Sequence, residues 1–391
     1  MNIIHSALIL LLRSAVTGEC YSLPDELDLE AVFKEAKRHS VFSMAYVGAI
    51  NCKVDKDLPI MKRLLSVSFA EALFSERQML SVDRISRAFE DNGIDYMLLK
   101  GCNMKKRYPK PEMRAMGDAD ILIREKDYEK ARELVEGLGF VKDNKDGDHS
   151  RNFTSRDLYL ELHVRFIARD EHPALAEYFG DGWKNARLVD GHRYEIPVED
   201  EFIFSFVHFF KHYVYNGVGL KHIIDLWIFL EKESKMNLEY VEKELEGLGN
   251  LTFYKNVTNS LNVLFFEENG DEKTKIIIER VLECGTWGTA QTAAIRQGSS
   301  NRQNAGKLSN ARAYTVFRAI FPSLKVLKKQ YPILQKHAYL LPFMWVARWV
   351  EVIVHNRYKI AYLGKRIKVM SDEKIDDYEA KLRFVGINLA D

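Results

Sequence analysis

Apolar positions divide the chain into helical flanks around one segment of short strands. Residues 1–90 carry apolar side chains near the helical period, which predicts an N-terminal helical region. Residues 91–198 instead contain short apolar runs and alternating positions, which are typical of a small sheet with a few helices. The helical period returns in residues 199–294 and 312–391. Residues 295–311 are polar, contain glycine and serine and lack this period, so they are expected to be a flexible linker.

Four strands are expected in the central segment. They cover residues 96–99, 119–123, about 151–154 and 158–166, and an amphipathic helix at 128–138 separates the second from the third. The chain is therefore expected to have an α+β fold, in which a small mixed-sheet core is flanked by N-terminal helices and a large C-terminal helical domain.

Two aspartates accompany the second of these strands. Asp118 and Asp120 are two residues apart, so their side chains are expected on one face, while Ala119 and Ile121 point to the other. Neighbouring carboxylates repel each other, and burying them is costly. A divalent cation removes both costs, and carboxylate oxygens suit Mg²⁺. An Asp-x-Asp pair is also common by chance in solvated turns and helix caps, so the interpretation depends on its surroundings.

The strand at 158–166 adds a third carboxylate. Its apolar positions alternate with Tyr159, Glu161, His163 and Arg165, which therefore share the opposite face. This pattern fits an ordinary strand with one face in water. It also fits a metal cluster in which Glu161 joins the two aspartates, and His163 holds Glu161 or lines the pocket. Three carboxylates on two neighbouring strands are what a two-metal phosphoryl-transfer site requires.

Composition narrows the partners that this protein can have. The net charge of +1 over 391 residues gives no overall basic field, which argues against binding of extended nucleic acid but leaves a local patch for tRNA open. The four cysteines are far apart in the sequence, so neither a zinc site nor a disulfide framework is expected, and a reducing cytoplasm fits best.

Two apolar stretches have some features of membrane segments. Residues 3–12 lack a basic lead and are too short to span a bilayer, so a packed first helix is expected. Residues 337–354 are interrupted by Arg348 and Glu351, so no transmembrane segment is expected there either. For this second stretch, burial in a core is favoured over an amphipathic helix that docks on another surface.

With these residues in place, the chain resembles the nucleotidyltransferase superfamily that has the DNA polymerase beta-like fold, and within it an uncharacterised bacterial family. The resemblance covers about residues 94–230 and depends on the order and spacing of several motifs together. These motifs are Leu98-Leu99-Lys100-Gly101, Tyr108-Pro109-Lys110-Pro111 with Arg114, Asp118-Ala119-Asp120-Ile121-Leu122-Ile123, Glu161-Leu162-His163, His208 with His212, and Gly219-Leu220-Lys221-His222-Ile223-Ile224-Asp225-Leu226.

The resemblance implies a role for each matching residue. Asp118, Asp120 and Glu161 correspond to the metal-binding and catalytic triad, with Glu161 as general base or third ligand. Two Mg²⁺ ions are implied, with Mn²⁺ as the alternative ion, and residues 199–294 are expected to complete the active-site cleft. The residues that it places near the nucleotide and its phosphates are Lys100, Gly101, Arg114, His163, Lys221 and Asp225.

One residue departs from the superfamily pattern. After the glycine that ends the first strand the superfamily usually has a serine, whereas this chain has Cys102, whose thiol is a weaker hydrogen-bond donor. The contact with the triphosphate at this position is therefore in question, and this bears on whether the protein is active.

Two functions are consistent with the resemblance. The first is an enzyme that moves a nucleoside monophosphate from a nucleoside triphosphate such as ATP to an acceptor hydroxyl, with release of pyrophosphate. The acceptor is a small molecule, a sugar, a protein side chain or an RNA end such as that of tRNA. The second is a catalytically weak or inactive relative that binds a nucleotide or a partner protein.

Overall fold

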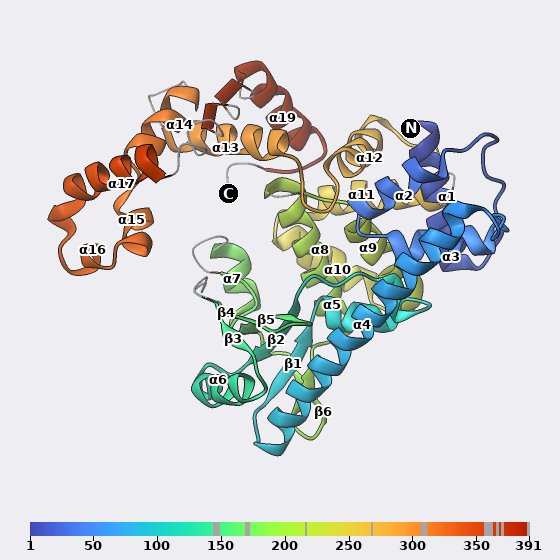
Figure 1. Cartoon of the computed structure of the whole chain (residues 1–391), viewed down its shortest axis with the longest axis horizontal. Coiled ribbons are helices and arrows are strands. Elements are labelled where there is room, and N and C mark those ends of the chain that lie inside the picture. The colour runs from blue at the N-terminus through green and yellow to red at the C-terminus, as the bar shows by residue number, and fades with distance from the viewer. Residues whose placement is uncertain are drawn as a thin grey trace. The chain divides into compact units, whose positions relative to one another are not determined.

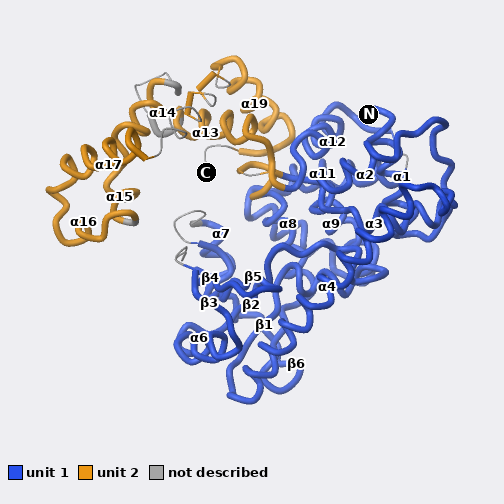
Figure 2. Tube along the Cα trace, viewed as in Figure 1, with its two compact units in different colours: residues 1–210, 218–286 blue, residues 211–217, 287–391 orange. Residues whose placement is uncertain are grey.

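The computed structural model describes residues 1–143, 149–168, 173–215, 217–266, 269–305, 311–355, 363–364, 367–368 and 371–388. The chain forms two units, which consist of residues 1–210 with 218–286 and of residues 211–217 with 287–391. Figure 1 shows the elements, and Figure 2 shows how the chain is divided between the units. None of the described helices is both long enough and apolar enough to cross a membrane.

Helices α1 to α4 form the N-terminal region that the sequence predicts. They are α1 (Ile3–Thr17), α2 (Leu29–Arg38), α3 (Phe42–Asn51) and α4 (Pro59–Asp91). As expected, the first helix is packed, and it buries Leu8, Leu11 and Leu12. It lies very close to α3, because a Cβ atom on Gly48 would be 1.9 Å from the carbonyl oxygen of Leu11.

The sheet contains the four predicted strands and three that were not predicted. The predicted strands are β1 (Tyr96–Leu99), β2 (Ala119–Ile123), β4 (Ser150–Thr154) and β5 (Tyr159–His163). The additional strands are β3 (Val141–Lys142), β6 (Arg187–Asp190) and β7 (Arg193–Glu195). The strand order is β3-β4-β5-β2-β1-β7-β6, and β2 with β5 and β1 with β7 are parallel pairs. The mixed sheet of the predicted α+β fold is confirmed.

One face of the sheet forms the hydrophobic core. Ile121 of β2 and Leu162 of β5 are fully buried there. The last turns of α4 pack on this face through Phe89, and α6 (Tyr128–Gly137) packs on it through Val135. Side chains alternate along a strand, so Asp120 lies on the opposite face of β2 from Ile121. The core therefore fixes the face on which the carboxylates stand.

Further helices of the first unit follow the sheet. They are α7 (Pro173–Phe179), α8 (Val198–Tyr215, whose last residues belong to the second unit), α9 (Leu220–Lys232), α10 (Leu238–Gly247), α11 (Leu251–Phe265) and α12 (Glu272–Cys284). α9 is almost wholly buried, and its Trp227 stacks on Phe265 with ring centroids 4.0 Å apart. The sequence separates residues 91–198 from 199–294, whereas the structure keeps the sheet and these helices together up to residue 286.

The second unit is helical and contains the predicted linker. Its main elements are α13 (Ala290–Ala305), α14 (Ala311–Ile320), α15 (Leu324–Gln330), α16 (Ile333–Lys336), α17 (Leu341–His355) and α19 (Asp372–Phe384). Residues 295–305 are thus part of a helix rather than a flexible linker, and residues 306–310 lie outside the described residues. The cause is tertiary: Ser299 Oγ donates a hydrogen bond to Glu379 Oε1 (2.6 Å), and Arg302 forms an ion pair with Asp376.

The expectation of burial for residues 337–354 is wrong. The helix α17 that they form has no buried residue. An apolar stripe at helical spacing shows which face of a helix is apolar, but it does not show that another element covers that face.

The close contact between α1 and α3 gives a stability prediction. Gly48→Ala places a methyl group against the backbone of Leu11, so the free energy of unfolding is expected to fall by about 1–3 kcal/mol, as for other overpacked cores. Gly137→Ala, in α6, is the matched control because no atom lies within 4 Å of its added Cβ. Urea denaturation of both variants is the measurement, and equal effects would contradict the packing described for α1.

Candidate active site

The sheet places two of the predicted carboxylates side by side. In the register of the parallel strands β2 and β5, Asp120 is paired with Glu161, and on its other side Asp120 is paired with Leu99 of β1. Lys100 directly follows Leu99, and its Nζ lies 2.8 Å from Asp120 Oδ1. The carboxylates of Asp120 and Glu161 and the amine of Lys100 therefore lie together, on β2, on β5 and at the end of β1.

His163 connects the two carboxylates. Its Nε2 lies 2.8 Å from Asp120 Oδ1 and 3.3 Å from Glu161 Oε2. Ionised carboxylates can only accept hydrogen bonds, so Nε2 carries the proton that both share. The hydrogen bond from His163 is the main reason why the pKa of Glu161 is lowered. His163 thus fixes the positions of both acids and keeps Glu161 ionised.

Lys100 balances the charge of Asp120 from a strained position. Burial alone would raise the pKa of Asp120, but Lys100 and His163 outweigh burial and hold that pKa far below its usual value. Lys100 itself has φ +43° and ψ −114°, a conformation that residues with a side chain rarely adopt. Such strain persists only where the surrounding structure enforces it, and it is concentrated at functional sites.

Asp118 stands just before β2 and outside the tight group of acids. Ligand atoms of Asp120, Glu161 and His163 all lie within 4.8 Å of one another, and Asp118 is not part of that group. Its pKa is raised, first by burial and then by the charge of Asp120, while Lys100 opposes the change. Asp118 is therefore close enough to Asp120 for their charges to interact, and the expectation that both side chains share one face stays a prediction.

The donor set fits a hard divalent cation. Lys100 and His163 both contact Oδ1 of Asp120, so Oδ2 is the oxygen of this residue that an ion would take. Carboxylate oxygens from paired strands are the ligands that Mg²⁺ and Mn²⁺ prefer. His163 donates to both carboxylates and so resembles the second-shell partners that orient metal ligands. The residues present therefore suit the ion that the sequence predicts.

The backbone after β1 is tightly packed at Gly101, so a side chain there would force Arg114 to shift. A Cβ atom on Gly101 would lie 2.7 Å from Nη1 of Arg114. The next residue, Cys102, is fully buried with Sγ 3.9 Å from Met116 Sδ, and burial raises the pKa of its thiol to about 12. The residue that departs from the superfamily pattern thus belongs to the hydrophobic core, as a neutral thiol.

Arg114 and Asp225, both predicted near the nucleotide, bind each other. Arg114 donates to Asp225 through Nε (3.1 Å) and Nη2 (2.9 Å), and Tyr108 OH donates to Oδ1 of the same carboxylate (2.7 Å). Arg114 is 8% exposed and Asp225 is 9% exposed. This buried group joins the loop before β2 to α9. A direct contact of either residue with a nucleotide stays a prediction.

A second, partly buried ion pair joins the same loop to the helices. Arg107, in the 3₁₀ turn Lys105–Arg107, donates to both oxygens of Glu201 in α8 (3.1 and 2.8 Å). It also donates to Glu233 (2.8 Å), just after α9. These residues were not predicted from the sequence, because partners about a hundred positions apart leave no local pattern. Tyr108 begins the motif Tyr108-Pro109-Lys110-Pro111, and its place in that motif is the sequence signal that could have identified it.

Lys221 brings a second amine to the site from the first turn of α9. Burial lowers its pKa to about 8, with a further lowering from Arg114, while Asp225 and Asp118 act in the opposite direction. Lys221 and Asp225 are four residues apart on α9, a spacing that suggests an ion pair between them. Asp225 instead pairs with Arg114, which comes from the loop before β2. Lys100 and Lys221 are thus two cations near the acidic group.

Comparison with known proteins follows this geometry. The sequence matches a family described as "Uncharacterised nucleotidyltransferase" over residues 25–265, more than half of the chain. The chain belongs to this nucleotidyltransferase family. The resemblance drawn from the motifs is therefore confirmed, and the general role of the protein is nucleotidyl transfer.

Further comparisons add little to the family assignment. No curated protein matches the sequence. Among solved structures, the solution structure of the antibiotic-resistance factor ANT(2'')-Ia is similar at 14% sequence identity and a TM-score of 0.33, over 50% of this chain and 100% of that chain.

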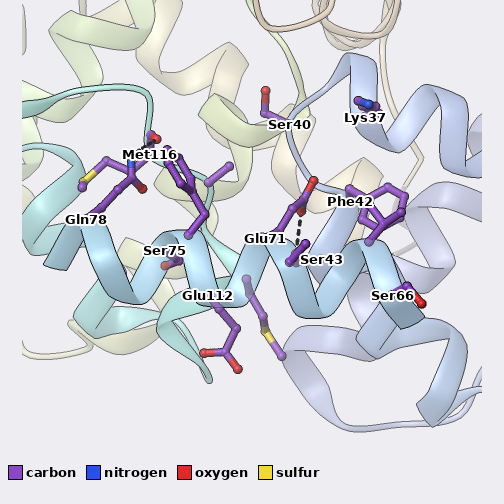
Figure 3. Close-up of a pocket in the computed structure, with 15 residues that line it drawn as sticks. Lys37, Ser40, Phe42, Ser43, Ser66, Glu71, Ser75, Gln78, Glu112 and Met116 are labelled. Atoms are coloured by element: carbon purple, nitrogen blue, oxygen red, sulfur yellow. Dashed lines mark hydrogen bonds between the residues drawn. The ribbon is translucent and has the colours of Figure 1, made fainter. Parts of the chain in front are cut away.

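This nucleotidyltransferase also has a cavity of about 610 Å³ beside the loop that leads to Asp118. Its walls include Phe42, Glu71, Phe74, Met113 and Met116 (Figure 3). Gln78 Nε2 in α4 donates to the carbonyl oxygen of Met116 (3.0 Å), whose side chain touches Cys102. A molecule in this cavity would therefore contact the loop that carries the active-site residues.

The buried group around Asp225 gives a second prediction. Asp225→Asn leaves the guanidinium of Arg114 buried without its counter-charge, so the free energy of unfolding is expected to fall by about 3–5 kcal/mol. Asp57→Asn is the matched control, because Asp57 pairs with Lys62 on the surface with a 90% exposed side chain, and no measurable change is expected. Urea denaturation tests both. If the two substitutions have equal effects, α9 is not held to the sheet as described.

Proposed function

We propose that this nucleotidyltransferase is a Mg²⁺-dependent enzyme that transfers a nucleoside monophosphate from a nucleoside triphosphate to an acceptor hydroxyl. The observation that carries the proposal is the pairing of Asp120 with Glu161 across β2 and β5, beside Lys100 and on the face opposite the core. Asp120 is buried and Glu161 is partly buried, and two acids at this spacing repel each other, so the compensation of their charge by Lys100 and His163 indicates a use for that charge.

The three acids would hold the metal ion, and one of them would also accept a proton. Asp118, Asp120 and Glu161 would hold Mg²⁺, or Mn²⁺, with two ions as the expected number. When bound, the metal supplies positive charge against the triphosphate and the developing charge at phosphorus. Glu161, kept ionised by His163, is the residue placed to accept the proton of the acceptor hydroxyl.

The cations and the glycine position the triphosphate. Lys100 and Lys221 would carry positive charge toward the phosphate oxygens, and the backbone N–H groups at Gly101 would donate to them. Arg114 packs against Gly101 and so supports this loop. Its positive charge would also act on the triphosphate. Since phosphoryl transfer depends mainly on positioning and electrostatic stabilisation, these residues supply most of what the reaction needs.

The reaction balances without any other reagent. The acceptor oxygen forms a bond to the α-phosphorus, and the bond from that phosphorus to the bridging oxygen breaks. Pyrophosphate leaves with the electron pair of the broken bond, and the hydroxyl proton goes to Glu161. The acceptor is a hydroxyl on a small molecule, a sugar, a protein side chain or an RNA end, and the donor is ATP or another nucleoside triphosphate.

Replacement of the acids tests the proposal directly. Asp120→Asn and Glu161→Gln are expected to lower transfer by at least about 100-fold, since loss of even a second-shell partner commonly costs 10–100-fold. Glu133→Gln, on the exposed side of α6, is the matched control and is expected to be unchanged. The measurement is incorporation of label from each of the four α-labelled nucleoside triphosphates, with Mg²⁺ and cell extract as the source of acceptor.

Removal of metal and binding of nucleotide complete this test. A chelator should abolish incorporation, and added Mg²⁺ should restore it. Activity that survives Asp118→Asn combined with Asp120→Asn would overturn the mechanism. Calorimetry that detects nucleotide binding by the wild type but no transfer to any acceptor in the extract would support the inactive relative instead.

A further inference from the structure

The charge of the chain is concentrated in one segment of the second unit. Residues 311–370 contain twelve Lys and Arg residues and one acidic residue, Glu351, so this segment carries a net charge of +11. The whole chain has a net charge of only +1, so the rest of the protein is acidic. A segment of this kind attracts polyanionic surfaces, and the structure shows that it includes α14 to α17.

The inner face of α17 is the face turned toward the end of α14, and its side chains donate hydrogen bonds to that segment. Nε1 of Trp345 donates to the carbonyl oxygen of Pro322 (2.9 Å), and Nε1 of Trp349 donates to that of Ile320 (2.7 Å). Arg348 lies between them in sequence and donates to the carbonyl oxygen of Ala319 (2.8 Å). These three hydrogen bonds hold α17 against the end of α14, and they fix the rotation of the helix.

The outer face of α17 is apolar along its whole length. Five large apolar side chains recur there at helical spacing and are between 52% and 67% exposed: Phe343, Val346, Val350, Ile353 and Val354. The exposed residues of this helix are apolar except for His355 at its end. Monomeric soluble proteins rarely expose a contiguous stripe of this kind unless it contacts a partner or a membrane.

We propose that this outer face of α17, together with the basic residues of its unit, is a docking surface for an anionic lipid bilayer. α17 has 15 residues, so it would lie in the plane of the membrane surface rather than cross it. The five apolar side chains enter the boundary between headgroups and acyl chains, and Lys and Arg residues such as Arg318 and Lys336, both exposed, face the anionic headgroups. This proposal does not rest on the transfer reaction.

The chemistry of the surface favours a bilayer over two other occupants. RNA would be attracted by the charge, but four of the five exposed side chains are valine or isoleucine, which provide neither stacking nor hydrogen bonds to bases. A second copy of the chain would bury the apolar stripe, but it would bring two strongly basic segments together. A bilayer with anionic lipids satisfies both the apolar stripe and the positive charge.

Sedimentation with vesicles tests the proposal on the full chain. The protein is expected to bind vesicles of phosphatidylcholine mixed with phosphatidylglycerol, and to bind pure phosphatidylcholine vesicles at least about tenfold more weakly. Raising the salt concentration to about 1 M, where the Debye length is about 3 Å, should release most of it. Equal binding to the two kinds of vesicle, or no binding to either, would overturn the proposal.

Paired variants separate the apolar and the basic contributions. Val346→Ser with Val350→Ser is expected to weaken vesicle binding about tenfold or more, since both side chains leave the interface. Leu65→Ser with Leu73→Ser, which are 53% and 45% exposed on α4, should have no effect. Arg318→Glu with Lys336→Glu should also weaken binding, whereas Lys34→Glu with Lys126→Glu, exposed in the first unit, should change it much less.

Two further outcomes would assign the surface to another occupant. A gel shift with homopolymer RNA that is lost in the Arg318–Lys336 variant and kept in the valine variant, without vesicle binding, would indicate RNA. Light scattering that shows a dimer which the valine variant dissociates, again without vesicle binding, would indicate self-association. Either result overturns the proposal, and thermal melts that match the wild type exclude unfolding as the cause.

Discussion

The burial of the Asp120 carboxylate is the constraint on which the rest of the site depends. Asp120 is 1% exposed, lies next to Glu161 in the sheet register and is close to Asp118. An uncompensated charge in such a place would be protonated or would destabilise the fold. Lys100 and His163 supply the compensation through one oxygen, Oδ1, which leaves the other oxygen for an ion. The strained backbone of Lys100 is a consequence of placing that amine at the strand end.

The helices after the sheet are as necessary to the site as the strands. Arg107 and Arg114 come from the segment between β1 and β2, and their partners Glu201, Asp225 and Glu233 come from α8, α9 and the turn after α9, respectively. Arginine forks of this kind fix orientation as well as distance. They set the position of Lys221 at the start of α9 relative to the acids. The candidate active site is therefore formed by the sheet and the helical region together.

The sequence revealed the parts of this protein that depend on local periodicity. Strands β1, β2, β4 and β5, the face shared by Glu161 and His163, and the N-terminal helices follow from it. The short strands β3, β6 and β7 were missed because they have too few residues to show a period. The pairing of Arg114 with Asp225 and the helix at residues 295–305 depend on partners distant in sequence. The exposure of α17 was missed because an apolar stripe does not reveal what covers it.

The most direct measurement of the central claim is binding of Mn²⁺, a spectroscopic substitute for Mg²⁺, followed by electron paramagnetic resonance. Free Mn²⁺ should decrease further when the wild-type protein is added to a non-hydrolysable ATP analogue than with the analogue alone, since the analogue itself binds the ion. Asp120→Asn should abolish this effect, because it removes the carboxylate that pairs with Glu161 across the sheet. The exposed substitution Glu133→Gln should leave it unchanged. Equal Mn²⁺ binding by the wild type and the Asp120 variant would contradict the account.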